Sequence, residues 1–176
     1  IAILAETGTK IAHCPVCNAK LDSGTLRLHD CRAAGITVGL ATDGPASHNA
    51  LDMFQEMKFA GMIHKDKMHD VTFLKTGELL EMSTAEAAKA MNRPETGVLA
   101  PGKKADVIII DLDTPHSLPV YDIAAALVYS ARADDVITTI CDGNVLMEDR
   151  VLPGVDEAEI RSRFRAAAHA LRARSL

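Results

Sequence analysis

Short apolar runs alternate with amphipathic segments in the first half of the chain. Ile36, Val38 and Leu40 alternate with small residues, a pattern typical of a buried strand. This pattern predicts that residues 1–6 are the end of a helix and that a strand at 10–14 stops at Pro15. It then predicts a helix at 26–34, the strand at 36–42 and a helix at 50–63. Such alternation with short links predicts a parallel sheet whose faces are covered by helices.

The helix at 50–63 is predicted to have a broad apolar face, which contains Leu51, Phe54, Met57, Phe59 and Met62. The alternation of strands and helices ends after this helix. Alanine-rich helices follow at 77–92, with capping-box spacing at Ser83–Glu86 that marks a helix restart. A strand is predicted at 107–110, a hairpin at 136–147 and a terminal amphipathic helix at 155–171. The hairpin rests on Asp142-Gly143, which supplies the positive φ angles of a tight turn.

Two architectures therefore meet near residue 95. We expect strand–helix units at 1–95, a small β layer at 96–150 and a terminal helical segment at 151–176. The fold class is α/β.

Composition limits the possible partners. The 176 residues carry a net charge of -5 without a basic stripe, and aromatic residues make up only 3%, so nucleic-acid binding is not expected. No apolar run approaches the roughly 20 residues that span a bilayer, and no secretory signal is evident. The chain opens at Ile1, so we expect that its natural start is missing. Four sparse cysteines favour a reducing, cytoplasmic setting without membrane partners.

Cys14 and Cys17 have the spacing of a redox motif or a zinc knuckle. A second cysteine pair at matching distance is lacking, so a structural zinc ribbon is disfavoured. We interpret both as small, semi-buried residues of a strand end and its turn, and keep the redox protein as a weaker alternative.

Asp43 is the leading catalytic candidate. It follows the strand at 36–42, and Gly44-Pro45 turns the chain immediately afterwards. In strand–helix barrels, catalytic groups gather at the carboxyl ends of the strands. A carboxylate held there can ligate a metal or move a proton. An equally simple interpretation is that Asp43 caps the following helix.

Four blocks resemble the amidohydrolase superfamily, in the branch of purine-type deaminases, including methylthioadenosine and S-adenosylhomocysteine deaminases, and triazine hydrolases. The blocks are residues 13–21, residues 41–58 with Ala41-Thr-Asp-Gly44, residues 97–111, and residues 118–143. The resemblance implies strands seven and eight of a (β/α)8 TIM-type barrel, with part of a small β-sandwich domain. Cys17 and Ala41 stand where the family commonly has serine and glycine, which affects substrate identity more than reaction class.

The resemblance also implies site chemistry. One divalent metal, zinc or iron, lies in the barrel mouth, and Asp43 matches the aspartate that ligates it and shuttles a proton. We expect Ser47, four residues further on, to contact substrate, with a helix cap as the alternative. His13 is expected to point into the mouth as a substrate contact near the metal rather than as a ligand.

The remaining histidines that we assign from their surroundings have other expected roles. His48 is placed in a loop at the site's rim, His64, His69 and His169 are expected to be solvated, and His116 is expected to help the tail pack.

Most of the family's metal ligands have no counterpart in this sequence. The family uses a His-x-His pair and further histidines, and this sequence contains no His-x-His. We therefore expect that this chain is a carboxyl-terminal piece of a longer enzyme and is inactive alone. We also expect the full-length protein to form a homo-oligomer.

The favoured function is a hydrolytic deaminase of an amino-substituted purine or related heterocycle, such as an adenosine derivative. A triazine-type chlorohydrolase, a guanine-type deaminase and a non-catalytic scaffold are the alternatives.

Overall fold

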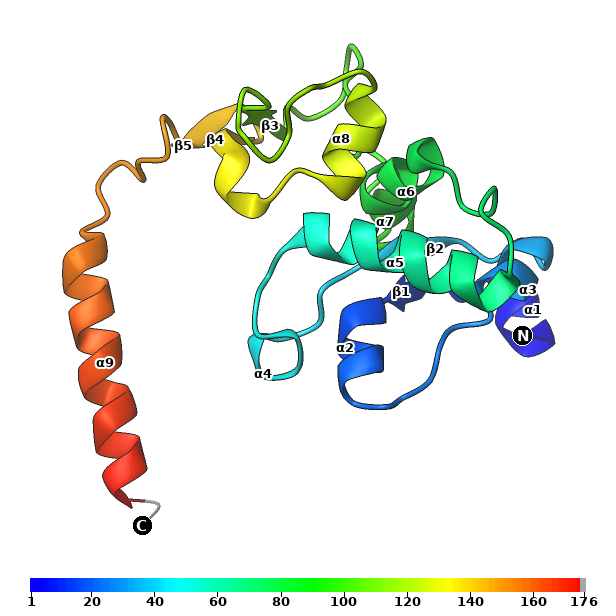
Figure 1. Cartoon of the computed structure of the whole chain (residues 1–176), viewed down its shortest axis with the longest axis horizontal. Coiled ribbons are helices and arrows are strands. Elements are labelled where there is room, and N and C mark those ends of the chain that lie inside the picture. Colours follow the sequence, from blue (N-terminus) through cyan, green and yellow to red (C-terminus); the bar gives the residue numbers. More distant parts are fainter. Residues whose placement is uncertain (175–176) are drawn as a thin grey trace.

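The computed structural model describes residues 1–174 and shows an α/β chain with two separate sheets (Figure 1). Strands β1 (Ile11–His13) and β2 (Val38–Leu40) form a parallel pair. The other sheet is antiparallel, with the order β3–β4–β5. Its strands are β3 (Val107–Ile110), β4 (Val136–Cys141) and β5 (Asn144–Met147). The predicted strand at 107–110 and the hairpin at 136–147 are confirmed.

Helices separate and follow the strands. Their bounds are α1 (Ala2–Glu6), α2 (Pro15–Lys20), α3 (Leu28–Ala33), α4 (Pro45–His48), α5 (Met53–Met68), α6 (Thr76–Ser83), α7 (Ala85–Ala90), α8 (Ile123–Tyr129), the 3-10 helix η1 (Ala133–Asp135) and α9 (Glu157–Arg174). Helices α2, α4 and α8 were not among the predicted elements. Pro15 does end β1, but it also begins α2, because proline at the first helical position gives up no hydrogen bond.

The β1–β2 pair is packed between helices. Val38 and Leu40 are buried in the main core, while the intervening Gly39 points the opposite way, toward α7. A Cβ atom at Gly39 would lie 2.6 Å from the Cα of Ala87. Only glycine lets the α7 backbone approach β2 this closely.

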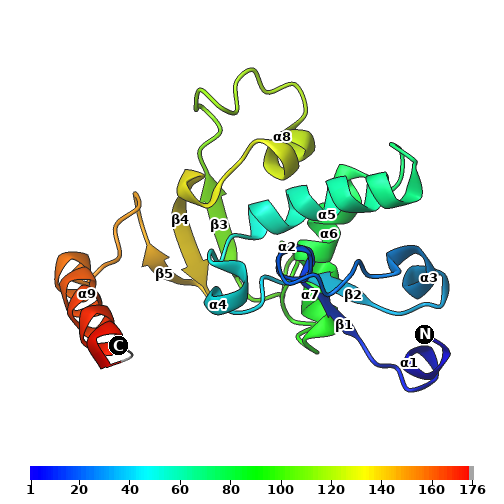
Figure 2. The same ribbon diagram turned by 60° about the horizontal axis from the view of Figure 1, so that its bottom comes forward.

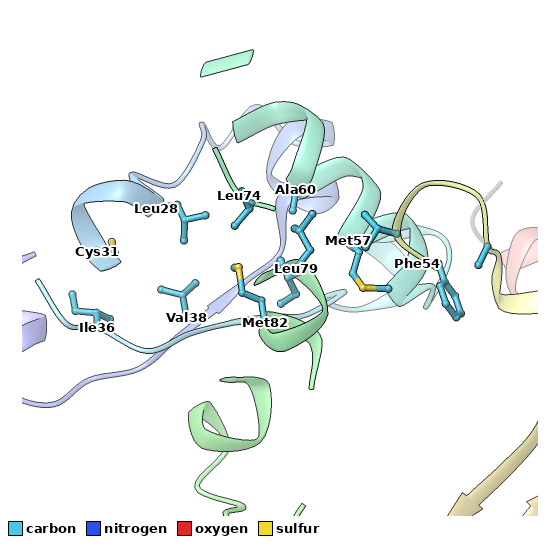
Figure 3. Packing of buried hydrophobic residues seen from close by; sticks show 13 residues of the cluster. Leu28, Cys31, Ile36, Val38, Phe54, Met57, Ala60, Leu74, Leu79 and Met82 are labelled. Atoms are coloured by element: carbon cyan, nitrogen blue, oxygen red, sulfur yellow. The ribbon is translucent and has the colours of Figure 1, made fainter. Parts of the chain in front are cut away.

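The main hydrophobic core joins α3, β2, α5 and α6 (Figure 3). Leu28, Val38, Leu79 and Met82 are each at most 2% exposed. Burying an apolar side chain of this size stabilises the fold by about 1.5–3 kcal/mol. The core therefore fixes β2 firmly, and with it the segment that follows β2.

Helix α5 differs from its prediction at both ends. It starts at Met53, where Asp52 caps it by accepting from the Phe54 and Gln55 amides, and it runs to Met68 rather than to 63. Phe54 and Met57 are buried as predicted. The predicted burial of Leu51 and Met62 is wrong, because these side chains are 64% and 48% exposed.

Polar residues occupy the remaining buried positions of α5. Glu56 is 0% exposed and His64 is 2% exposed, so the expectation that His64 is solvated is wrong. Both side chains meet polar partners inside the fold, which is what permits their burial.

The helix restart near residue 84 is confirmed, but its predicted capping box does not form. The Ser83 and Thr84 hydroxyls instead donate to the carbonyls of Leu79 and Leu80, one turn earlier. The hairpin turn has the expected left-handed residues, with φ of 49° at Asp142 and 80° at Gly143.

Helix α9 stands apart from the rest of the chain in both views (Figures 1 and 2). The three-stranded sheet lies between α9 and the helices around β1–β2 (Figure 2). The boundaries predicted at 95 and 150 stay predictions. Among the residues that the structure describes, no helix combines the length and the apolar character needed to span a membrane.

Candidate functional site

The carboxyl ends of β1 and β2 lie at the same edge of their parallel sheet, and α2 and α4 begin there. Asp43 lies three residues beyond β2, and its side chain is exposed. Its φ of 61° places it in the left-handed region, which few side chains other than Asn and Asp tolerate. Such backbone strain concentrates at functional sites, because the surrounding structure must hold it in place.

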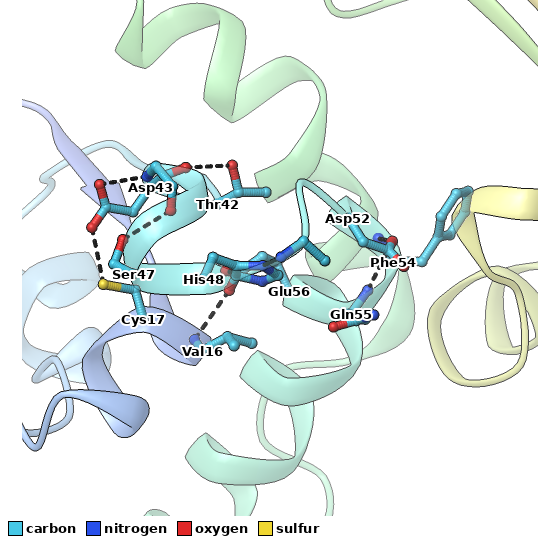
Figure 4. Close-up of polar contacts among 12 residues, drawn as sticks. Val16, Cys17, Thr42, Asp43, Ser47, His48, Asp52, Phe54, Gln55 and Glu56 are labelled. Carbon is cyan, nitrogen blue, oxygen red and sulfur yellow. Dashed lines mark hydrogen bonds and ion pairs between the residues drawn. The ribbon is translucent and has the colours of Figure 1, made fainter. Parts of the chain in front are cut away.

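Two donors fix the Asp43 carboxylate (Figure 4). The Cys17 thiol donates to Oδ2 at 2.9 Å, and the Gly44 amide donates to Oδ1 at 2.7 Å. The Cys17 thiol, the Gly44 amide and the Ser47 hydroxyl hold the pKa of Asp43 below its usual value. Asp43 is therefore an ionised carboxylate near neutral pH, which is the form that ligates cations and accepts protons.

The interpretation of Asp43 as a helix cap is wrong. Gly44 is the N-cap of α4, and this helix has no side-chain cap hydrogen bond. Asp43 accepts from the Cys17 thiol and from the Gly44 amide, and Gly44 precedes the first residue of the helix. The cap for α5 is Asp52, a residue that the sequence pattern did not single out.

Ser47 lies inside α4, so it is not an N-cap either. Its hydroxyl is partly buried and donates to the Gly44 carbonyl at 3.0 Å (Figure 4). This bond places the Ser47 side chain one helical turn from Asp43. The structure thus brings Ser47, Cys17 and Asp43 together from α4, α2 and the end of β2.

Cys14 and Cys17 are free cysteines. Burial raises the pKa of the Cys14 thiol, and the hydrogen bond to Asp43 raises that of Cys17. Redox and metal-binding cysteines act as thiolates, which raised pKa values disfavour. The contacts support Cys17 as a hydrogen-bond donor and give no support to a redox pair.

His13 lies at the end of β1 but faces α5. Its Nε2 is 2.9 Å from Nε2 of His64, and the ring is 2% exposed. Burial lowers the pKa of His13 to about 3 and that of His64 to about 4, so both rings are neutral near pH 7. The structure therefore joins His13 to His64 rather than to Asp43 and Ser47, and the substrate contact at His13 stays a prediction.

The other histidines with predicted positions differ in how far they are buried. His48, expected at the rim of the site, is 5% exposed and lies against Glu56. His69 and His169 are exposed, as predicted. His116 bonds the buried Asp135 at 2.9 Å, which ties the segment after β3 to η1.

Glu56 was not predicted from the sequence as a residue near the site. An acidic residue inside an apolar helix face, between Phe54 and Met57, is nevertheless a usable signal.

Within residues 1–174, no group of three or more His, Cys, Asp or Glu side chains has an arrangement that holds a metal ion. Asp43 is the carboxylate that this edge of the sheet offers. One carboxylate meets only part of the donor set of a catalytic zinc site, which takes three protein ligands.

Comparison with known proteins gives the family. The amidohydrolase family matches residues 1–146. The chain is 45% identical to the 5-methylthioadenosine/S-adenosylhomocysteine deaminase of Haloarcula marismortui over 97% of its length, and it covers 39% of that relative. It is 43% identical to the 5'-deoxyadenosine deaminase of Methanosarcina mazei over 99% of its length, covering 40% of that relative. The chain thus spans about two fifths of the length of these curated relatives.

Solved structures agree with this assignment. A zinc-bound adenosine deaminase from Xanthomonas campestris superimposes with a TM-score of 0.92 at 30% identity, over 97% of this chain and 39% of that one. A zinc-complexed atrazine chlorohydrolase from Arthrobacter aurescens gives a TM-score of 0.86 at 28% identity, over 94% and 37%. The predicted resemblance is confirmed, and the chain belongs to the amidohydrolase family.

Proposed function

We propose that the protein containing this chain is a metal-dependent hydrolase that deaminates an amino-substituted purine, with an adenosine derivative as substrate. The observation that carries the proposal is the ionised, exposed Asp43 carboxylate, held in a strained conformation at the carboxyl end of β2. The relatives named as 5-methylthioadenosine/S-adenosylhomocysteine and 5'-deoxyadenosine deaminases support the purine substrate.

The Asp43 carboxylate fits one position in the ligand set of a divalent metal, zinc or iron. Oxygen donors suit such a cation, and the lowered pKa keeps the carboxylate deprotonated. The remaining ligands would come from outside this chain. When bound, the metal supplies Lewis-acid chemistry that lowers the pKa of the attacking water.

The chain's own residues would move the proton and orient the substrate. Asp43 accepts a proton from the attacking water and returns it to the departing amino group as general base and then general acid. The Cys17 and Gly44 donors keep the carboxylate oriented during both steps. Ser47 has its partly buried hydroxyl one turn away on α4, and it is proposed to contact the substrate.

His13 takes no part in the proposed proton transfer. Its ring is buried against His64, so a substrate would reach it only after both rings moved.

The proposal also covers the fold, the assembly and the location of the whole protein. We propose that β1 and β2 are strands seven and eight of a (β/α)8 barrel, that the chain forms a carboxyl-terminal part of a homo-oligomeric enzyme, and that the four free cysteines suit the cytoplasm.

A triazine-type chlorohydrolase is the second candidate, because the atrazine chlorohydrolase superimposes with a TM-score of 0.86. The higher identity to the named deaminases, 45% and 43% against 28%, favours deamination.

The test is product release by the complete gene product. We expect ammonia from 5'-methylthioadenosine, S-adenosylhomocysteine or 5'-deoxyadenosine, with loss of activity after chelation and recovery with zinc. Guanine distinguishes a guanine-type deaminase, and chloride release from atrazine distinguishes the chlorohydrolase. Absence of turnover on every substrate, with zinc bound, would refute the catalytic proposal and favour a scaffold.

A further inference from the structure

The Glu56 side chain reaches two elements besides its own helix. It projects from α5 and is fully buried. Its Oε2 accepts from the Val16 amide at 3.2 Å, in the first turn of α2. Its Oε1 lies 3.1 Å from Nε2 of His48, the last residue of α4 (Figure 4). One carboxylate therefore links α2 and α4 through α5.

The tautomer of His48 follows from its other nitrogen. The Ala50 amide donates to Nδ1 at 3.1 Å, so Nδ1 must present its lone pair. The proton of the neutral ring is then on Nε2, directed to the side of Glu56. The two side chains are thus matched as donor and acceptor.

This contact is costly to maintain. Nε2 of His48 and Oε1 of Glu56 approach without full hydrogen-bond alignment, and within the described residues neither atom has a hydrogen-bond partner. A buried polar atom without a complete hydrogen bond destabilises the fold, and an apolar pair of similar shape would avoid that cost. Burial also raises the pKa of Glu56 to about 7. Stability alone does not account for a carboxylate at this position.

The two elements that Glu56 joins each carry one side of the Asp43 contact. Helix α2 contains Cys17, whose thiol donates to Asp43, and α4 begins directly after Asp43 and Gly44. We propose that Glu56 and His48 form a positioning pair that holds the Cys17–Asp43 contact in place. This inference rests on the proposed role of Asp43 and adds to it the residues that fix its geometry.

The pair makes a specific demand on residue 56. Its two oxygens face two donors, the Val16 amide at Oε2 and His48 Nε2 at Oε1. A carboxylate accepts from both, whereas the glutamine amide has one oxygen and must turn its NH2 group to one of them. A change of His48 tautomer cannot relieve this, because a proton on Nδ1 would face the Ala50 amide. The nearly isosteric Glu56→Gln variant should therefore loosen the link without emptying the core.

The alkylation rates of three cysteine thiols can report whether the contact between Cys17 and Asp43 is held in place. Cys17 is 5% exposed at the site, Cys31 is 2% exposed in the core on α3, and Cys141 is exposed at the end of β4. In the complete gene product loaded with zinc, the alkylation rate of each thiol can be followed by mass spectrometry. We expect Glu56→Gln to raise the rate at Cys17 about tenfold or more, and to leave Cys31 protected and Cys141 unchanged.

Zinc affinity is a second readout. We expect it to fall by about 10–100-fold in Glu56→Gln, because mutation of residues that orient metal ligands typically weakens metal binding by this factor. For substrates that turn over, kcat should fall while KM changes little, because the displaced group is the carboxylate that moves the proton. The matched control is Asp66→Asn, which removes an exposed carboxylate from the same helix and should change none of these values.

A second pair of variants separates positioning from packing. His48→Leu removes the donor and His48→Gln keeps one, so Cys17 should be more reactive in His48→Leu than in His48→Gln. Equal protection of Cys17 in the wild-type, Glu56→Gln and His48→Leu proteins would overturn the proposal, as would a parallel rise at Cys31. If Cys17 is deprotected as expected but no substrate is deaminated, the positioning pair stands and the proposed function fails.

Discussion

The buried pair of His13 and His64 should make the stability of the fold sensitive to mild acid, and the His64→Phe substitution isolates half of that effect. Both rings are 2% exposed, and their Nε2 atoms are 2.9 Å apart. Phenylalanine keeps an aromatic ring beside Phe73, which contacts the His64 ring at a centroid distance of 6.5 Å, but it cannot bind a proton.

The size of the effect follows from the shifted pKa. Burial, together with the charges of Lys67 and Arg32, lowers the pKa of His64 from 6.5 to about 4. A lowered pKa means that stability is complete above about pH 6.5 and is lost as the pH falls, because only the unfolded chain binds the proton. Between about pH 7 and pH 5 the loss is about 2 kcal/mol for His64 alone.

Glu56 acts in the opposite direction over the same range. Burial raises its pKa to about 7, against the opposing effect of the Val16 amide. His48, Cys14 and Cys17 are titratable groups that interact with Glu56. The folded chain therefore keeps a proton that the unfolded chain releases, and acidification to about pH 5 stabilises the fold by about 2 kcal/mol. The wild-type curve alone is a sum of opposing effects, which is why a variant comparison is needed.

The assay is urea unfolding followed by far-ultraviolet circular dichroism, because the chain has no Trp to report by fluorescence. The difference in unfolding free energy between His64→Phe and wild type should shift by about 2 kcal/mol in favour of the variant between about pH 7 and pH 5. His169→Phe, at an exposed position on α9, is the control and should show no shift. A His64→Phe difference that stays constant with pH would contradict the lowered pKa of His64.

Three further predictions concern packing, hydrogen bonding and metal. Gly39→Ala should destabilise the fold by about 1–3 kcal/mol, because its Cβ would press on the Ala87 backbone. Gly77→Ala in α6 meets nothing within 4 Å and should stabilise the fold by about 0.5 kcal/mol. Equal shifts of the melting temperature in the two variants would contradict this packing. Cys17→Ser keeps a donor to Asp43 and should retain activity within about tenfold, whereas Cys17→Ala should lose more, and kcat measured for both variants tests the ranking. Removing zinc with a chelator should abolish deamination in the complete gene product, and activity that persists in metal-free protein would contradict the assignment of the metal.

Local signals in the sequence were enough to predict the strands and the position of Asp43 after β2. Alternation at 36–42 and the Gly44-Pro45 turn placed a carboxylate at the end of β2, and Asp142-Gly143 fixed the hairpin. These features depend on a few neighbouring residues, so periodicity and turn chemistry predict them. The hydrogen bond from Cys17 and the strained φ of Asp43 depend on contacts between separate elements, and no local pattern contains them.

The buried polar residues were the hardest to predict. His64 and Glu56 look like solvated positions by residue type, yet both lie on the core side of α5 because His13 and Val16 supply their partners. Likewise, Leu51 looks like a core residue but precedes the helix cap at Asp52 and is exposed. Pairing at long sequence separation decided these positions, and a single sequence does not display it.

Ammonia release by the complete gene product carrying Asp43→Asn, with zinc content measured on the same sample, tests the catalytic role of Asp43. The amide keeps the size of the side chain but ligates metal weakly and cannot accept the proton. We expect kcat to fall by about 10²–10⁴-fold with the fold intact. Turnover close to that of the wild type, with zinc still bound, would contradict it.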